Sequence, residues 1–236
     1  MPGTWLQSFI ARRSFLARLG TGIGILGATT VASSAALAAA PAGPKEWKPA
    51  RHEQDNWLDE VPGVHRFVFD TTTPAGFDAA LRFARNYYFT NEMSYGLKDS
   101  DLAVLLIARA RSTAFGYSDA MWAKYGMLLS QQSGFTDPKT KQPPAVNFYA
   151  TADDGSGDPV SGAMQALIKS GVRIGVCAAA TRNIAMRIAT ATNGDREAIN
   201  KELSSNLICP NARMVPAGIV AVNRAQERGY SLVSPG

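Results

Sequence analysis

The sequence predicts a single α/β domain in which a mainly parallel sheet carries helices on both faces. Residues 102–108 read LAVLLIA, a continuous apolar run that is too short for a helix and is bounded by polar residues. Such a run is typical of a strand buried on both faces of a parallel sheet. Strand-like and helix-like segments then alternate to the end of the chain, and no internal repeat or second domain is evident. This alternation is typical of α/β proteins.

The folded part is expected to begin near Val64. Residues 65–70 have the composition of a short strand, and three threonines followed by Pro74 are typical of a turn that leads into a helix. Apolar residues recur at helical spacing over residues 75–95. Ser118 or Asp119 is expected to cap a helix that continues through Leu129.

The second half of the chain repeats the pattern after a long interruption. Residues 130–161 are rich in Gly, Pro, Asp and Lys and are expected to form a long loop or insertion within the 64–236 domain. Helices are expected at 160–170, 178–191, 196–204 and 216–228, and strands at 172–176, 213–215 and 231–233.

The first 38 residues have the features of an export signal. A twin-arginine pair, Arg12 and Arg13, precedes a weakly hydrophobic, uncharged stretch that runs to Ala40. The small residues around Ala38 predict a cleavage site, so we expect export by the twin-arginine route to the periplasm. The alternative is an uncleaved membrane anchor, which the many Gly, Ser and Thr residues make a poor lipid-facing helix. With cleavage, the membrane is met only during export.

Charge gives no reason to expect a nucleic-acid partner. The whole chain has a net charge of +5. Three of its arginines and none of its acidic residues lie in the predicted signal, so the mature chain would carry 5 − 3 = +2. The basic character therefore belongs partly to the signal.

Residues 39–63, rich in Pro, Trp and charge, are expected to form an extended arm rather than a packed element. Trp47 and Trp57 would either clip this arm to a surface or a neighbouring subunit, or cover the core of their own domain.

Composition excludes several kinds of site. Two histidines and two cysteines, with no Cys-x-x-Cys motif, leave no histidine-rich metal site, covalent haem or thioredoxin-type redox centre, and no cofactor is expected. The acidic, glycine-rich residues 153–158 resemble a calcium loop but lack the later glutamate of an EF-hand, so a solvated turn is expected.

Candidate functional residues gather at the predicted carboxyl ends of the strands, where open parallel sheets place their sites. These positions bring Asp70, Arg109, Arg111 and Cys177 to one edge, beside the segment 216–218. The two arginines suit a sulfur oxyanion such as thiosulfate, or they are plain surface charges.

Cys177 is the candidate reactive group. It lies immediately before a predicted helix, and a helix amino terminus favours a thiolate. Arg182 in the next turn would add positive charge, and three alanines after the cysteine would leave the sulfur sterically open. The alternative is a small buried core residue, because free cysteine is among the most buried residue types.

Two segments resemble a known family. Residues 171–180, GVRIGVCAAA, resemble the segment around the sulfur-carrying cysteine of the DsrE/TusD-like sulfur-relay proteins. Residues 214–220 with 226–230 resemble the closing strand, helix and Gly-Tyr strand of that family, and the likeness covers about residues 64–234. The resemblance implies a three-layer α/β/α domain with a five-stranded sheet, and assembly as a trimer or hexamer.

In relay members of that family, the matched cysteine accepts a persulfide from one partner protein and passes it to another. The resemblance thus implies sulfur-carrier or sulfurtransferase activity at Cys177, with a sulfur donor or acceptor protein as partner. An exported branch of the family would meet other partners than a cytoplasmic relay does. The alternative function is a non-catalytic oligomeric binding or assembly module in the periplasm.

A disulfide between Cys177 and Cys209 is opposed by the predicted topology. One cysteine ends a strand and the other precedes the next, so about 15 Å separates the two edges of the sheet. A disulfide joins Cα atoms no more than about 7 Å apart. We therefore expect Cys209 to be free or to pair with another chain.

Overall fold

Strand β2 (Leu102–Ala108) is the centre of the fold. All seven of its residues are buried, as expected for the apolar run LAVLLIA. In the computed structural model, which describes residues 47–150 and 163–235, β2 is the middle strand of a five-stranded sheet of order β4-β3-β2-β1-β5. The prediction of an α/β domain with one sheet is confirmed.

All four strand pairings are parallel, so the sheet is entirely parallel rather than mainly so. Strand β1 (His65–Thr71) pairs with β2 along its whole length. The remaining strands are β3 (Arg173–Cys177), β4 (Ala212–Val215) and β5 (Ser231–Val233). In this register Thr71 lies beside Ala108, and Cys177 lies beside Val215. The carboxyl ends of β1, β2, β3 and β4 therefore meet at one edge of the sheet.

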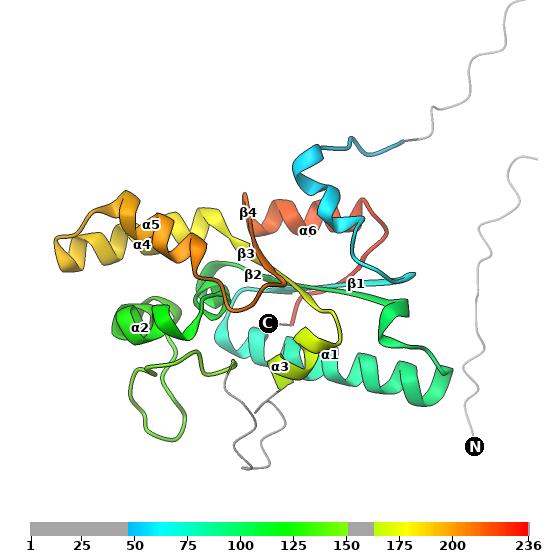
Figure 1. Cartoon of the computed structure of the whole chain (residues 1–236), viewed down its shortest axis with the longest axis horizontal. Helices are drawn as coiled ribbons and strands as arrows, with labels where there is room; N and C mark the ends of the chain where they lie inside the picture. Colours follow the sequence, from blue (N-terminus) through cyan, green and yellow to red (C-terminus); the bar gives the residue numbers. More distant parts are fainter. Residues whose placement is uncertain (1–46, 151–162, 236) are drawn as a thin grey trace, which may run out of the picture. The chain divides into compact units, whose positions relative to one another are not determined.

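Helices cover both faces of the sheet (Figure 1). On one face lie α1 (Pro74–Tyr95) and α3 (Ala163–Lys169), and on the other lies α6 (Gly218–Gln226). Helices α2 (Asp119–Ser133), α4 (Ala178–Thr192) and α5 (Arg196–Ser205) lie together at the side of β3 and β4 (Figure 1). Three short 3-10 helices complete the fold: η1 (Glu53–Leu58), η2 (Asp99–Asp101) and η3 (Ala110–Gly116).

The helix boundaries follow the expected signals closely. The Thr73 Oγ1 accepts a hydrogen bond from the Gly76 backbone N at 2.9 Å, and Pro74 occupies the first turn of α1. Helix α1 ends at Gly96, whose φ of 66° lies in the left-handed region that glycine adopts readily. Helix α2 has Ser118 at its N-cap position without a side-chain cap hydrogen bond.

Alternate residues of β2 supply two cores. Val104 and Leu106 belong to the larger core with α1, α2 and α4. Ala103, Leu105 and Ile107 belong to a smaller core with α6 and η1. This alternation explains why the run is apolar throughout, because a strand covered by helices on both sides has no solvent-facing side.

The expectation of an extended arm is wrong for residues 53–61. This segment forms η1 and packs in the smaller core, where Trp57, Leu58 and Val61 are buried. Trp57 therefore covers the core of its own domain, and the Arg213 guanidinium stacks over its ring at 5.1 Å. The Tyr230 hydroxyl donates to the Leu58 carbonyl oxygen at 2.9 Å, which ties η1 to the segment after α6.

The described part of the 130–161 insertion is packed rather than loose. Helix α2 continues to Ser133, beyond the expected break, and Phe135 and Tyr149 lie against Phe115 with ring centroids 5.3 and 4.8 Å apart. The Asn147 side-chain amide donates to the carbonyl oxygens of Phe115 and Tyr117. These contacts fasten residues 135–149 to η3. The calcium-like residues 153–158 lie outside the described residues.

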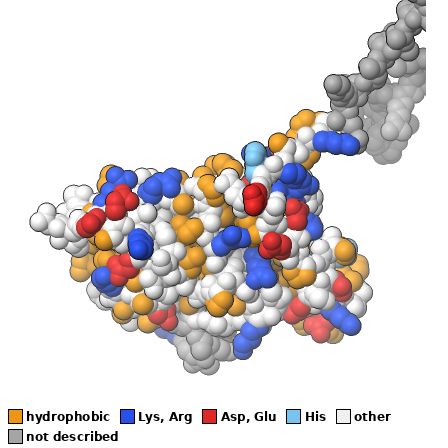
Figure 2. Space-filling view, turned by 45° about the horizontal axis from the view of Figure 1, so that its top comes forward, with side chains coloured by type: hydrophobic (Ala, Val, Ile, Leu, Met, Phe, Trp, Pro, Cys, Tyr) orange, Lys and Arg blue, Asp and Glu red, His pale blue; other side chains and the backbone are white. Residues whose placement is uncertain are grey.

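The predicted export signal also lies outside the described residues. Within residues 47–150 and 163–235, no helix is long and apolar enough to cross a membrane. Figure 2 shows acidic and basic side chains interspersed on one face of the molecule.

Packing of η1 predicts a stability effect at Leu58, which is fully buried. Leu58→Ala should lower the free energy of unfolding by about 2–5 kcal/mol, because it leaves a cavity between η1 and α6. Asn56→Ala, on the exposed side of the same short helix, should change it by less than about 0.5 kcal/mol. Urea denaturation measures both, and a neutral Leu58→Ala would show that this segment is not part of the folded core.

Candidate functional site at the carboxyl ends of the strands

The parallel register brings three of the five predicted site residues together. Asp70 comes from the end of β1, Arg109 follows β2, and Cys177 ends β3. The first turn of α6, which follows β4, completes the site through Gly218. We call Asp70, Arg109, Cys177 and Gly218 the strand-end site.

The Cys177 sulfur lies between the first turns of two helices. Its Sγ accepts a hydrogen bond from the backbone N of Ala180 in α4 at 3.4 Å and from that of Gly218 in α6 at 3.2 Å. Backbone N–H groups at a helix start carry partial positive charge, so the sulfur lies where two helix starts direct their hydrogen-bond donors. Cys177 is the N-cap residue of α4, and its side chain accepts the hydrogen bond from the Ala180 backbone N.

The expectation of a sterically open sulfur is wrong, because Cys177 is buried at 6% exposure. The three alanines do follow it, but the group that contacts the sulfur from elsewhere in the chain comes from the first turn of α6. The Gly218 backbone contacts the sulfur directly, and Gly218 also packs against the Arg109 side chain. The start of α6, against which the Arg109 side chain packs, thus contributes to the burial of the sulfur.

Arg109 is held by a bidentate ion pair with Asp70. The Nε and Nη2 atoms of Arg109 donate to the two carboxylate oxygens of Asp70 at 2.6 and 2.8 Å. The hydrogen bond to Asp70 is the main cause that raises the pKa of Arg109, and the charge of Cys177 adds to it. Asp70 therefore acts on the arginine, and the arginine in turn lies within electrostatic reach of the sulfur.

Gly218 fits Arg109 because it has no side chain. A Cβ atom at this position would lie 2.5 Å from the Arg109 Cβ and 2.9 Å from its Cδ. Contacts below 3 Å between carbon atoms are repulsive, so any other residue at 218 would push Arg109 away. The residue after Arg109, Ala110, has a φ of 53°, a left-handed conformation that costs a non-glycine residue about 1 kcal/mol.

Buried hydroxyl groups lock the ends of β1 and β2 beneath this pair. The Ser112 Oγ lies 2.9 Å from the carbonyl oxygens of Thr71 and Arg109 and accepts from the Arg109 backbone N at 3.1 Å. The Thr71 hydroxyl donates to the Ile107 carbonyl oxygen at 2.8 Å. These hydrogen bonds hold the backbone of Arg109 in place. The position of its guanidinium therefore depends on the side-chain torsions of Arg109 alone.

A second buried chain of hydrogen bonds supports Cys177 from the other side. The Tyr117 hydroxyl lies 2.8 Å from the Thr181 Oγ1, and Thr181 donates to the Cys177 carbonyl oxygen at 2.9 Å. Burial is the main cause that raises the pKa of Tyr117, so its hydroxyl stays protonated at neutral pH. This chain links η3 to the start of α4.

The other two predicted site residues lie elsewhere. The Arg111 Nε donates to the Ser133 carbonyl oxygen at 3.1 Å, so its positive charge caps the carboxyl end of α2. Arg182 is exposed on α4. The structure therefore gives Arg111 a structural role, and it shows no contact between Arg182 and the strand-end site.

Cys209 lies at the opposite edge of the sheet from Cys177, as the topology predicted. Both cysteines are free. Cys209 precedes β4, whereas Cys177 pairs with Val215 at the end of that strand. Burial is the main cause that raises the pKa of Cys209, against weaker opposing effects from nearby backbone N–H groups.

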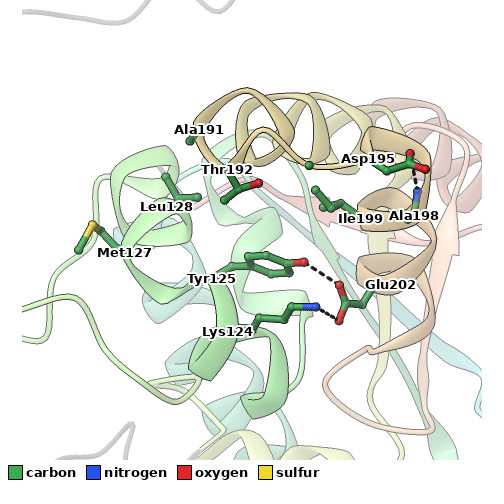
Figure 3. Close-up of a pocket in the computed structure, with 11 residues that line it drawn as sticks. Lys124, Tyr125, Met127, Leu128, Ala191, Thr192, Asp195, Ala198, Ile199 and Glu202 are labelled. Carbon is green, nitrogen blue, oxygen red and sulfur yellow. Dashed lines mark hydrogen bonds and ion pairs between the residues drawn. The ribbon is translucent and has the colours of Figure 1, made fainter.

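A separate groove of about 830 Å³ lies between α2 and the α4–α5 pair (Figure 3). Its apolar lining includes Leu128 and Ile199, and at one end Lys124 and Tyr125 both hydrogen-bond to Glu202, at 2.6 and 2.7 Å. The bond from Lys124 is the main cause that lowers the pKa of Glu202. None of the five predicted site residues lines this groove, and sequence patterns did not indicate it.

Metal chemistry has no support within residues 47–150 and 163–235, where no group of three His, Cys, Asp or Glu side chains could hold an ion.

Comparison with known proteins gives one distant structural match and no family. No family model and no curated protein matches the chain. One solved structure with similarity is a protein of unknown function from Methanobacterium thermoautotrophicum, 14% identical, with a TM-score of 0.37. The match covers 73% of this chain and all of that one.

Because Asp70 pairs with Arg109, loss of the Asp70 carboxylate should destabilise the protein more than loss of the Asp78 carboxylate. Asp70→Asn should lower the free energy of unfolding by about 2 kcal/mol, because it leaves a partly buried guanidinium without its counter-charge. Asp78→Asn removes the half-buried pair with Arg82 on the surface of α1 and should cost about 0.3–0.5 kcal/mol. Chemical denaturation of both variants measures the difference, and equal losses would contradict a special role for Asp70.

Proposed function

We propose that this protein is an exported sulfur carrier of the DsrE-like type, in which Cys177 accepts a sulfur atom as a persulfide or holds a small sulfur compound beside it. The observation that carries the proposal is the pair of backbone N–H groups, from Ala180 and Gly218, that converge on the Cys177 sulfur. Such donors would hydrogen-bond to the anionic persulfide that forms on this sulfur.

The chemistry requires no metal and no electron acceptor. The Cys177 thiolate attacks the outer sulfur of a donor persulfide, R–S–SH, and a new S–S bond forms as the donor S–S bond breaks. The donor leaves as a thiolate with the electron pair of that bond, and the product is Cys177–S–SH, which ionises to the persulfide anion. Attack by an acceptor thiolate on the terminal sulfur reverses these roles and returns the Cys177 thiolate.

Arg109 is the group through which a donor would reach the sulfur. Its side chain is 26% exposed, whereas that of Asp70 is 6% exposed. Asp70 occupies Nε and Nη2 of the guanidinium, and within residues 47–150 and 163–235 no residue hydrogen-bonds to Nη1. The Nη1 side of the guanidinium is therefore available to hydrogen-bond to an incoming sulfur anion.

A second candidate function is a non-catalytic binding or assembly module in the periplasm. The observation that favours it is the burial of Cys177 at 6% exposure, which is ordinary for a structural cysteine. In that case the sulfur would only cap the two backbone N–H groups at the starts of α4 and α6, and the thiol would remain unmodified.

Intact-protein mass spectrometry separates the two functions. Protein purified without reductant, then incubated with sulfide plus an oxidant, with polysulfide or with thiosulfate, should gain the mass of one sulfur atom. The gain should disappear on treatment with a reducing thiol and in Cys177→Ser. Cys209→Ser is the matched control and should keep the full gain, because Cys209 lies at the other edge of the sheet. A bare thiol with every donor, or a gain that follows Cys209, would contradict the sulfur-carrier proposal.

A further inference from the structure

A polar pocket of about 260 Å³ lies at the amino ends of β3 and β4, at the opposite edge of the sheet from the strand-end site. Its lining includes Trp57, Glu60, Arg173, Asn211 and Arg213. We call it the amino-edge pocket. Pockets that hold drug-sized ligands have volumes of about 300–1,000 Å³, so this smaller pocket suits a small molecule or an ion.

Strand pairing directs Arg173 and Arg213 to the same face of the sheet. Arg173 pairs with Leu105 of β2, which belongs to the smaller core. Arg213 pairs with Gly175, the residue two positions after Arg173 on β3. Residues two apart on a strand point to the same face, as do paired residues of neighbouring strands. With strands about 4.8 Å apart and a rise of about 3.3 Å per residue, the Cα atoms of the two arginines lie about 8 Å apart, so both guanidinium groups can reach one small ligand.

Neutral groups hold both guanidinium groups in position without cancelling their charge. The Arg173 Nη1 donates to the Asn211 Oδ1 at 2.8 Å, and the Asn211 Nδ2 donates in turn to the Ile168 carbonyl oxygen at 3.1 Å. The Arg213 guanidinium stacks over the Trp57 ring at 5.1 Å. Stacking occupies the face of a guanidinium and leaves the N–H donors in its plane free to bind an anion.

The aspartates nearest in sequence pair with other arginines. Asp55 lies 3.6 Å from Arg224, and Asp59 lies 3.0 Å from Arg228. Within residues 47–150 and 163–235, no carboxylate forms an ion pair with either arginine of the amino-edge pocket. Two neighbouring positive charges repel each other, so an anion bound between them would be stabilising.

Glu60 also lines the pocket and opposes an anion there. With two arginines and one glutamate, the lining carries a net charge of 2 − 1 = +1. Glu60 is exposed, and water and salt screen the repulsion from an exposed carboxylate. That repulsion is therefore weaker than the attraction of two guanidinium groups that contact the anion directly.

We propose that the amino-edge pocket binds a phosphate-type dianion, as the free ion or as the end of a small phosphate monoester, through Arg173 and Arg213. The planar guanidinium group of arginine forms paired hydrogen bonds with phosphate oxygens. A dianion matches two positive groups in charge. The pocket and Cys177 lie at opposite edges of the sheet, so the proposal stands independently of sulfur transfer.

Isothermal titration calorimetry of the purified protein with inorganic phosphate tests the proposal, at about pH 8, where phosphate carries about two negative charges. The wild type should bind one phosphate per chain with a Kd of about 1 mM or lower, and added NaCl should weaken the binding. Arg173→Gln and Arg213→Gln should each raise the Kd at least about tenfold, because each removes a charged donor. Arg187→Gln is the matched control, since it removes an exposed arginine of α4, and it should change the Kd less than about twofold.

Two further variants test the roles of charge and of guanidinium geometry. Glu60→Gln should lower the Kd about twofold, because it removes the repulsion of a neighbouring carboxylate. Arg213→Lys keeps the charge but loses the planar set of donors, so it should raise the Kd about tenfold. This variant also keeps the proposal falsifiable if Arg213→Gln fails to fold, and far-UV circular dichroism checks that its fold is that of the wild type.

Titration with glycerol 3-phosphate distinguishes the two forms of the dianion. A lower Kd than that of inorganic phosphate would assign the site to a monoester, and a higher Kd would assign it to the free ion. The absence of saturable binding with both anions would overturn the proposal. A Kd unchanged in both Arg173→Gln and Arg213→Gln, or an equal loss of binding in Arg187→Gln, would also overturn it.

Discussion

The parallel register of β1 to β4 is the constraint on which the strand-end site depends. Because the strands end at the same level, the carboxylate at the end of one strand, the guanidinium after the next and the sulfur at the end of the third meet at one edge. A shift of β4 by one residue relative to β3 would move Gly218 away from Cys177 and remove one of the two N–H groups on the sulfur. The central strand β2, buried on both faces, fixes this register.

Local sequence predicts the elements well and their contacts poorly. The run LAVLLIA and the threonines before Pro74 place β2 and the start of α1 within a residue of their observed positions, because each signal is confined to one element. The burial of Cys177 depends on Gly218, which is 41 residues away and reaches the sulfur only because β4 lies beside β3. Strand order is a property of the whole chain, and no short motif encodes it.

The expectations for Arg111 and for the arm around Trp57 differ from the structure for related reasons. Position after a strand predicts that Arg111 belongs to the site, but the turn of η3 directs it to the carboxyl end of α2. The Pro-rich and charged surroundings of Trp57 predict an arm, whereas a few apolar residues, Trp57, Leu58 and Val61, suffice to fasten η1 to α6. In both cases the decisive partner lies far away in sequence. The groove beside Tyr125 shows the same limitation, because it is formed between helices that are not adjacent in the chain.

The strand-end site directs two hydrogen-bond donors at the Cys177 sulfur and leaves this sulfur little exposed to solvent. Two backbone N–H groups face Cys177, yet this residue is only 6% exposed, and the start of α6 contacts its sulfur. We propose that the Asp70–Arg109 pair opens when an anion binds. A buried sulfur is shielded from water until that moment, and this shielding protects it from oxidation. In the proposed transfer, Arg109 contacts the incoming anion beside the thiol.

A crystal structure of the protein after incubation with polysulfide tests this account most directly. We expect electron density for one added sulfur atom on the Cys177 Sγ, with the Arg109 guanidinium turned from Asp70 toward it and the Gly218 N–H still directed at the sulfur pair. An unmodified Cys177 beneath an unmoved Arg109–Asp70 pair, with added sulfur only on Cys209 or nowhere, would contradict it.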